Sequence, residues 1–321
     1  MSTESIFVSI ACLSDPDVIL TIKDGIKKAL HPEKLSFGIC LQILDDDENF
    51  AELKNLSCVR LKQVSAHDVK GPIYARYICE KLLESETYFL QIDCHTRFFQ
   101  NWDQILIDEF KKSLFLNQKA VLSYYPINTT NMFDKRILKR IGHINRFRYL
   151  GSDSIKSHGS LIDIPKIPIK SIGICAAMLF MRSIDRKKYG YDPNLDFGLH
   201  AAEQVLYAIR LWTNGFDIFC PTRHILSTEY LTNRDRIPLQ VKEINSRNRK
   251  DWPAATWTKV KFVLGLDSEK QIDHRYKKSI KNTLANYSLG SSRSLLDYYK
   301  LALIHEKLKD IFPNYSYRDV S

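Results

Sequence analysis

Short apolar runs alternate with amphipathic stretches along the first 125 residues of the chain. Runs rich in β-branched and aromatic side chains, bounded by polar turn residues, predict buried strands at 6–13, 35–44 and 88–93. Alternating apolar and polar positions predict a strand at 59–64, and a further apolar run predicts one at 119–125. The segments between these strands are long enough to hold helices.

Apolar residues recur at helical spacing in three of those segments. After a polar start at 14–17 that contains a proline, the pattern predicts a helix up to residue 29, and further helices at 71–83 and 102–116. Strands that alternate with helices in this way predict βαβ units and a mostly parallel sheet. In such sheets ligands bind at the carboxyl ends of the strands.

The pattern changes beyond residue 126. Residues 127–170 are basic and irregular, so we expect a long connection there that is part of an acceptor site or a lid. Apolar runs predict buried strands at 171–181 and 216–220, with a helix at 203–211 between them. From about residue 251 the chain is predicted to be helical again.

Composition places the chain among ordinary globular proteins. Its 321 residues suggest one large or two small domains, and 26% charged and 44% hydrophobic residues are typical of a folded chain. No apolar run reaches the roughly 18 residues of a membrane helix, and the first apolar run lacks the basic flank of a signal peptide. The seven cysteines are scattered without a CxxC pair, which indicates reduced thiols. We therefore expect a cytoplasmic protein.

The chain is strongly basic, with 47 Lys and Arg against 37 Asp and Glu, a formal net charge of +10. This charge suits a nucleotide sugar or another anionic ligand, an anionic membrane, or a nucleic acid. Basic residues concentrate at 135–150 and 270–281. Aromatic residues near the first cluster leave an RNA-binding interpretation open, but no nucleic-acid module signature accompanies them, and a solvated face is the commoner explanation. We predict no nucleic-acid partner.

Two segments place groups that bind metals or phosphates at the ends of predicted elements. Asp93 and His95 end the strand at 88–93, where a carboxylate and an imidazole could hold a divalent cation that bridges a diphosphate. A turn carboxylate beside an ordinary histidine is the alternative. Gly71 would let the backbone approach a ligand and Arg76 could reach a phosphate, although a solvated helix arginine is the commoner explanation.

A third segment combines carboxylates with amides. Asp192 and Asn194 precede Glu203 and Gln204, which open the helix predicted at 203–211. An acid beside an amide at this position can cap the helix, and it can also hold the hydroxyl groups of a sugar. The local chemistry favours capping.

Together and in this order, the segments resemble the GlcNAc-transferase family of GT-A type glycosyltransferases, which includes cytosolic hydroxyproline-GlcNAc transferases and bacterial relatives. The resemblance covers roughly residues 5–265 and is most specific at 88–103 and 203–222. The stretches that carry it are IFVSIACLSDPD at 6–17, KGPIYARYICEKLL at 70–83, YFLQIDCHTRFFQNWD at 88–103, KAVLSYYP at 119–126, CAAMLFMRS at 175–183, YDPNLDFGLHAAEQ at 191–204 and AIRLWTNGFDIFCPT at 208–222.

The resemblance implies a GT-A type α/β fold with a Rossmann-like, mostly parallel sheet flanked by helices. A nucleotide half at about 1–126 would join an acceptor half at about 127–265, followed by a helical extension at 266–321. The implied activity is metal-dependent transfer of a sugar, by resemblance N-acetylglucosamine from UDP-GlcNAc, to a hydroxyl of a glycan, a lipid-linked glycan or a protein. The family is grouped with transferases that retain the anomeric configuration.

The resemblance also assigns roles to individual residues. Mn²⁺ or Mg²⁺ would be held by Asp93 and His95, which stand at the family's Asp-x-His positions, and would neutralise charge on the leaving UDP. Glu203 and Gln204 stand at the family's Glu-Glu pair and are the predicted catalytic residues, with Asp192 shaping the sugar pocket. The predicted donor-binding residues are Ala11, Asp15, Arg76, Asp93, Ala176 and Ala177.

Two departures from the family pattern bear on activity. Thr228 stands where the family has a further metal-binding histidine, so that Glu229 or a water would have to substitute for it. Leu13 and Ser14 replace a Tyr-Arg pair in the first turn, which removes a ring and a cation near the nucleotide. These losses support an alternative, a catalytically weakened or inactive protein that binds nucleotide sugars or glycans.

The extension at 266–321 combines basic residues with aliphatic and aromatic stripes. A helical hairpin packed on the core is the simpler interpretation. The functional alternative is a homodimer interface, or a peripheral contact with the inner face of a membrane that would suit a lipid-linked acceptor.

Overall fold

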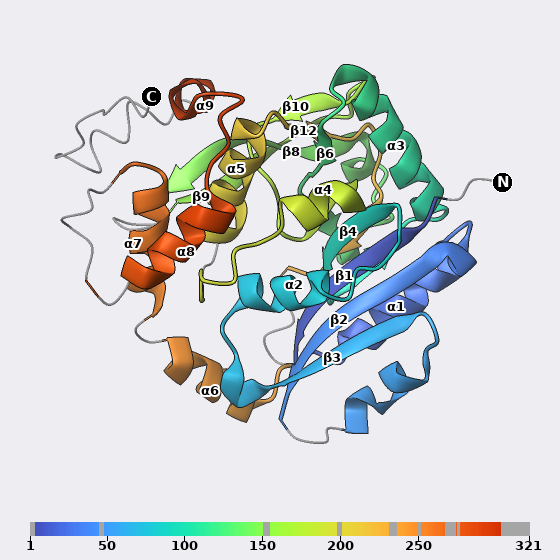
Figure 1. Ribbon diagram of the computed structural model, residues 1–321. Coiled ribbons are helices and arrows are strands. Elements are labelled where there is room, and N and C mark those ends of the chain that lie inside the picture. Colours follow the sequence, from blue (N-terminus) through green and yellow to red (C-terminus); the bar gives the residue numbers. More distant parts are fainter. Residues whose placement is uncertain are drawn as a thin grey trace.

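The computed structural model describes residues 4–44, 48–149, 155–197, 201–230, 236–249, 252–266, 274 and 277–302. Within these residues an eight-stranded sheet has the order β10-β12-β6-β11-β4-β1-β2-β3 (Figure 1). Its strands are β1 (Ile6–Leu13), β2 (Leu35–Ile43), β3 (Val59–Ser65), β4 (Tyr88–Asp93), β6 (Ala120–Leu122), β10 (Ile169–Ser171), β11 (Met178–Arg182) and β12 (Asp217–Cys220).

The part of the sheet built from residues 6–93 is parallel, as the sequence predicts. Strands β3, β2, β1 and β4 pair in parallel, and so do β12 and β6. Strand β11 runs antiparallel to both β4 and β6, and β10 runs antiparallel to β12. The predicted α/β class with a mostly parallel central sheet is therefore confirmed.

Helices cover both faces of this sheet, which makes three layers (Figure 1). Helices α1 and α3 lie on one face, and α2 and α5 lie on the other. The helices are α1 (Asp17–Lys28), α2 (Pro72–Glu80), α3 (Trp102–Leu116), α4 (Ser183–Lys188), α5 (Tyr207–Thr213), α6 (Leu239–Arg249), α7 (Trp252–Val263), α8 (Lys277–Tyr287) and α9 (Leu295–Leu301). Short 3-10 turns at Pro32–Lys34, Glu48–Asn55, Ala66–Asp68, Thr129–Asn131 and Ile137–Lys139 complete the connections.

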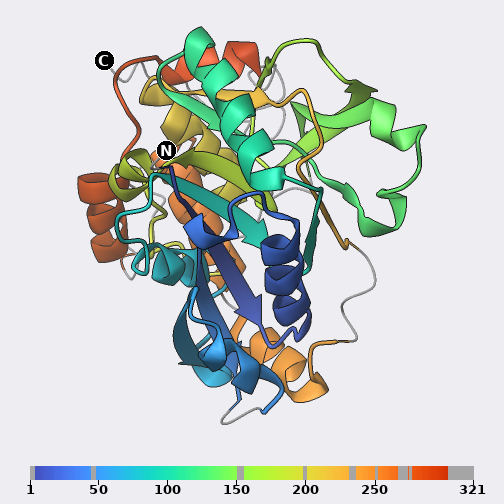
Figure 2. The same cartoon turned by 90° about the vertical axis from the view of Figure 1, so that its right-hand side faces the viewer.

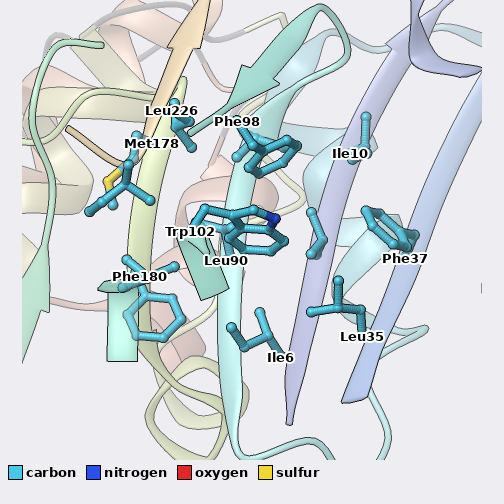
Figure 3. Packing of buried hydrophobic residues seen from close by; sticks show 14 of the residues in the cluster. Ile6, Ile10, Leu35, Phe37, Leu90, Phe98, Trp102, Met178, Phe180 and Leu226 are labelled. Atoms are coloured by element: carbon cyan, nitrogen blue, oxygen red, sulfur yellow. The ribbon is translucent and has the colours of Figure 1, made fainter. Parts of the chain in front are cut away.

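Strand β1 shows how the apolar pattern builds two cores. Ile6 and Ile10 point to the α1 and α3 face, where Trp102 fills the layer between sheet and helix (Figure 3). Phe7, between them in sequence, points to the opposite face and packs against Phe89 with ring centroids 5.9 Å apart. A strand with apolar residues at successive positions buries both faces, which explains why these strands appear as continuous apolar runs.

The interpretation of 127–170 as an irregular connection is wrong. Most of it is a long antiparallel hairpin of β8 (Arg140–Tyr149) and β9 (Ile155–Asp163), which stands out from the body at the right of Figure 2. A bulge between Ile144 and Arg146 shifts the register by one residue. Because a bulge reverses the alternation of faces, the pattern loses the period of two that identifies a strand. A second small sheet joins β5 (Thr96–Phe98), β13 (Leu226–Thr228) and β7 (Ile127–Asn128).

Three further predicted elements differ in their bounds. The run at 171–181 is not one strand: β10 and β11 occupy its ends, and Cys175 and Met178 form a tight bridge between them. The strand predicted at 119–125 is only Ala120–Leu122. The helix predicted at 203–211 begins two residues earlier as a π-helix, Ala201–Leu206, and continues as α5.

The described part of the C-terminal extension packs on the body of the molecule. Tyr298 and Tyr299 of α9 are buried beside α5, and Arg293 Nη1 donates to Asp217 Oδ1 at 2.8 Å. Lys277, Lys278 and Lys281 lie on α8, whereas Lys270 and Arg275 of the basic cluster fall outside the described residues. Among the helices described, none combines the length and apolar character that crossing a bilayer requires.

Candidate active site

The parallel pairing of β1 and β4 brings the turn that contains Asp15 beside Asp93 and His95. Ala11 pairs with Asp93 in the parallel register, so the turn that follows β1 lies beside the turn that follows β4. Across this junction His95 Nδ1 lies 3.2 Å from Asp15 Oδ2, and Cys94 Sγ lies 3.8 Å from the same oxygen. The predicted adjacency of these two strand ends is present.

Charge couples Asp15 to His95. Burial alone would lower the pKa of His95, but the hydrogen bond with Asp15 and the neighbouring Cys94 and Asp93 outweigh it and raise the pKa to about 11. Burial alone would raise the pKa of Asp15. The hydrogen bond with His95 and the one from the Asp17 amide outweigh burial, so the pKa of Asp15 is lowered. The imidazole is therefore protonated at neutral pH, and a metal bound there would displace its proton.

Arg76 joins two of the predicted acidic residues. Its guanidinium is 4% exposed, with Nε 2.5 Å from Glu203 Oε1 and Nη2 3.1 Å from Asp93 Oδ1. Burial raises the pKa of Glu203 even though Arg76 opposes the shift. Arg76 is thus a buried cation shared by two carboxylates, rather than a solvated helix residue.

Glu203 and Gln204 are the third and fourth residues of the π-helix Ala201–Leu206, and both are buried. Neither side chain caps a helix. Glu203 turns to Arg76, and Gln204 Oε1 has no hydrogen-bond partner among the described residues, although Gln204 is only 7% exposed. π-Helical turns are frequent at functional sites because the extra residue redirects side chains. The capping interpretation is therefore wrong for Glu203, and Gln204 presents an unused buried acceptor.

Ala176 and Ala177 form the turn before β11, beside the acidic residues. Gln91 Nε2 donates to the carbonyl of Ala176 at 2.8 Å, which fixes the turn against β4. Burial raises the pKa of the neighbouring Cys175 thiol to about 12, and the carboxylates of Asp93 and Glu203 act in the same direction. The turn therefore lies within electrostatic range of Asp93 and Glu203.

Asp192 is held by its own loop and by α8. Its Oδ1 accepts from the Asn194 backbone and side-chain amides at 2.9 and 2.7 Å, and its Oδ2 accepts from Thr283 Oγ1 at 2.6 Å. All of these contacts are within the protein, and Asp192 is 2% exposed. The structure therefore gives Asp192 a role in joining α8 to the loop that precedes the π-helix.

Thr228 and Glu229 lie next to His95 through β13. Thr228 pairs with Thr96, its Oγ1 lies 3.5 Å from the carbonyl of His95, and the Glu229 amide donates to that carbonyl at 3.2 Å. Thr228 therefore lies beside His95, and its hydroxyl contacts the backbone there. The Glu229 carboxylate pairs with Arg236 instead of turning to His95.

Sequence reasoning missed a cationic clamp over the β1 turn. Arg97 Nη2 lies 2.7 Å from Asp17 Oδ1, and Arg236 Nη1 lies 3.0 Å from Asp17 Oδ2 while its other nitrogen contacts Glu229. Asp17 follows the Asp-Pro turn and Arg97 follows the Asp-x-His tripeptide, so proximity to these motifs was the available signal. No local pattern marks Arg236.

A cavity of about 150 Å³ opens beside the ends of β1 and β2. Gly71, at φ +90°, shapes its wall: a Cβ there would lie 2.6 Å from Phe197 Cα. The lining residues are Ala11, Leu13, Gln42, Val69, Gly71, Pro72, Phe197 and Asn245. The cavity is mostly apolar with two amide side chains, which suits a flat heterocycle better than a phosphate.

The donor groups near His95 fit a hard divalent cation only in part. Ligand atoms of Asp15, Cys94 and His95 all lie within 4.8 Å of one another. A hydrogen bond with Cys12 and burial raise the pKa of the Cys94 thiol well above its ordinary value, so it stays protonated. Carboxylate and imidazole are suitable ligands, which leaves Asp15 and His95 as the pair that is already assembled.

Comparison with known proteins adds independent findings. A model of the family "Glycosyltransferase (GlcNAc)" matches residues 46–307. The structure of GalNAc-T7 with UDP, GalNAc and Mn²⁺ superposes with a TM-score of 0.62 at 12% identity, over 97% of this chain and 58% of that one. S. aureus TarS 1–349 in complex with UDP-GlcNAc gives 0.46 at 10% identity, over 94% and 92%. No curated protein matches the sequence.

The likeness to GalNAc-T7 bears on the fold alone, because the identity is low and this chain spans little more than half of that one. It agrees with the expected GT-A type fold.

Proposed function

Because the chain belongs to the GlcNAc glycosyltransferase family, we propose that it transfers a sugar from a UDP-sugar donor to a hydroxyl of a glycan or protein acceptor. We propose UDP-GlcNAc as the donor and retention as the stereochemical outcome, following the family resemblance. The observation that supports the proposal is the meeting of Asp15, Arg76, Asp93, His95 and Glu203 at the carboxyl edge of β1 and β4.

In this proposal the uracil base occupies the apolar cavity at the ends of β1 and β2, and the diphosphate lies over the β4 turn. Asp15, His95 and the nearby Asp93 would hold a divalent cation, which would neutralise charge on the departing diphosphate. The positively charged Arg97 and Arg236 beside the β1 turn add to the attraction for the donor.

The sugar of the donor would bind beside Glu203 and Gln204 of the π-helix and the turn that precedes β11. Arg76 holds the carboxylates of Asp93 and Glu203 in fixed positions and keeps both from repelling a donor. The free Oε1 of Gln204 can accept a hydrogen bond from a sugar hydroxyl or the acetamide N–H. The small side chains of Ala176 and Ala177 leave room for the ring at the adjoining turn.

A second function is a protein of the same fold that binds a nucleotide sugar without turnover. The hydroxyl of Thr228 faces backbone, and Asp93 is engaged by Arg76. Both features reduce the groups free for a metal.

Release of UDP from UDP-GlcNAc, with and without Mn²⁺, tests the proposal. We expect metal-dependent release in the parent, a loss of at least about tenfold in Asp93→Asn, and no change in Asp108→Asn. Asp108 is an exposed carboxylate on α3, so it provides the same charge change away from the site. Donor binding by calorimetry without turnover, with or without metal and acceptor, would instead establish the binding protein.

A further inference from the structure

A second cavity, of about 310 Å³, lies between the β8–β9 hairpin and the segment around β7 and β13. Such a volume holds roughly ten water molecules, which is sufficient for a monosaccharide with one substituent. Its lining residues are Tyr125, Pro126, Ile127, Gly142, Lys156, Ser157, His158, Gly159, Ser160, Leu161 and Tyr230. Among the residues that the structure describes, the lining contains no carboxylate, and two of its residues carry basic side chains.

Two tyrosines of this cavity are fixed in place. Tyr125 Oη donates to the Ser157 carbonyl at 2.5 Å, and Tyr230 Oη donates to the Pro126 carbonyl at 2.8 Å. Gly142 and Gly159 allow the hairpin to lie against Tyr125: a Cβ on either would come within 2.5 or 2.6 Å of Tyr125 atoms. Rigid aromatic side chains with a polar end are suited to bind amphipathic ligands such as sugars.

The hairpin carries a ladder of cations next to this cavity. Arg146 is paired with His158 and Arg148 is paired with Lys156 across the antiparallel register. Directly opposite residues point to the same face, so these four side chains share one face of the hairpin. Like charges placed opposite each other are destabilising, and among the residues described none of the three permanent cations has an ion-pair partner.

One observation supports this crowding of charge, and another places part of it at the cavity. Burial lowers the pKa of His158, and the nearby Arg146, Arg148 and Lys156 act in the same direction. The two side chains that line the cavity, Lys156 and His158, are only partly exposed, so they face the cavity rather than bulk solvent alone. A bound anion would relieve a repulsion for which the described residues provide no neutralising carboxylate.

The cavity lies next to the proposed active site. Tyr230 follows Thr228 and Glu229, whose backbone contacts the carbonyl of His95. Burial raises the pKa of Tyr230, and the nearby Cys175 and the Asp93 carboxylate act in the same direction. Strand β13 therefore connects the Asp-x-His turn to this cavity within a few residues.

We propose that this cavity is the acceptor subsite and that the acceptor is a saccharide bearing a phosphate or carboxylate group. The anion would lie against Lys156, His158 and the cation ladder, and the sugar ring would lie against Tyr125 and Tyr230. This inference rests on the proposed function. An extended RNA would need a longer basic surface, whereas this site is a cavity of about 310 Å³ lined by two tyrosines and two basic residues, and the chemistry favours a small charged sugar.

The test compares two probes and three proteins. Glucose 6-phosphate and its neutral counterpart, methyl glucoside, are titrated by calorimetry into the parent protein, into Arg148→Glu/Lys156→Glu, and into the control Lys278→Glu/Lys281→Glu. The control makes the same change in net charge on exposed residues of α8, which lies far from the hairpin in Figure 2. Melting temperatures confirm that each variant is folded.

We expect glucose 6-phosphate to bind the parent at least about tenfold more tightly than methyl glucoside, and the hairpin variant to lose about tenfold or more of that affinity. The α8 control should remain within twofold of the parent. Donor hydrolysis without acceptor should be unchanged in the hairpin variant, because none of its substitutions touches the donor site.

Equal affinity for the two probes, or an equal loss in the α8 control, would overturn the proposal. Tighter binding of a short single-stranded RNA than of glucose 6-phosphate, abolished in the hairpin variant, would overturn it in favour of a nucleic-acid surface. If the parent binds the sugar phosphate at the hairpin but releases no UDP from any donor, the cavity stands only as a binding site for an anionic saccharide, and the proposed transferase and the acceptor role both fail.

Discussion

Removing Arg76 should destabilise the protein in a manner that depends on pH. The guanidinium is the common partner of Glu203 and Asp93, and both its contacts are in a buried setting. Arg76→Met keeps a side chain of similar length and removes the charge. Because truncating one partner leaves the others buried without compensation, the structure predicts a large effect from a single substitution.

The magnitude follows from the burial of the pair. Breaking a buried ion pair by removing one partner costs about 3–5 kcal/mol. For domains of 150–250 residues a change of 1 kcal/mol shifts the melting temperature by roughly 2–4 °C, so a fall of about 10 °C is expected. The control Arg136→Met removes an exposed cation paired with Asp134 at 3.6 Å, and it should change stability by less than about 0.5 kcal/mol.

The pH dependence has a definite sign. Burial already raises the pKa of Glu203 in the parent, and loss of Arg76 removes the attraction that opposes this shift. The folded variant therefore binds a proton more tightly than the unfolded chain, so its stability increases as pH falls toward the unfolded value. The deficit relative to the parent should be largest near pH 8 and smaller near pH 5.

Thermal unfolding at pH 5, 6.5 and 8 measures this deficit, with Glu203→Gln added to Arg76→Met as a second variant. Neutralising Glu203 should recover part of the lost stability at pH 8, because one buried charge is removed. A loss below 1 kcal/mol in Arg76→Met, or a loss that does not change with pH, would refute the assignment of Arg76 as a buried charge partner.

Three further outcomes are expected. Gly71→Ala should lower stability by about 1–3 kcal/mol and weaken UDP binding, because φ is +90° and the added Cβ meets Phe197; unchanged melting and UDP affinity would contradict this. Thr283→Val should cost about 1.5–3 kcal/mol through the lost hydrogen bond to Asp192, and a loss below 0.5 kcal/mol in denaturant titration would argue against that anchor. Apparent Mn²⁺ affinity should rise about tenfold per pH unit between pH 6 and 8, since the metal displaces a proton from His95, and a flat profile in paramagnetic relaxation titrations would show that His95 is not a ligand.

Local pattern was sufficient for most of the first 125 residues. Helix α3 has the predicted bounds of 102–116, and β1 has the predicted bounds of 6–13, because each carries an uninterrupted period or run. The pattern failed at the β8–β9 hairpin, where a bulge reverses the alternation, and at 171–181, where a turn interrupts an apolar run. In both cases the bulge or turn involves only a few residues, so a hydrophobicity pattern averaged over a longer window does not detect it.

For the candidate site, too, the sequence indicated the location of some residues but not their partners. The location of Asp93 and His95 was apparent from the sequence, because Asp93 ends a recognisable strand and His95 follows two residues later, where parallel sheets expose their functional groups. The partners of these residues were not apparent. Asp15, rather than Asp93, is the carboxylate that contacts His95, and Asp93 pairs instead with Arg76.

The sequence alone determined the α/β class, the strand ends that hold the acidic residues, and the excess of positive charge, because these depend on neighbours a few positions apart. Only the tertiary structure decided that Arg76 meets Glu203, 127 positions away, and that four basic residues of the hairpin share one face beside Tyr230. Such pairings depend on how the sheet closes and on strand register. Both are set by the packing of the whole chain, because burial and pairing energies act between surfaces that local sequence does not bring together.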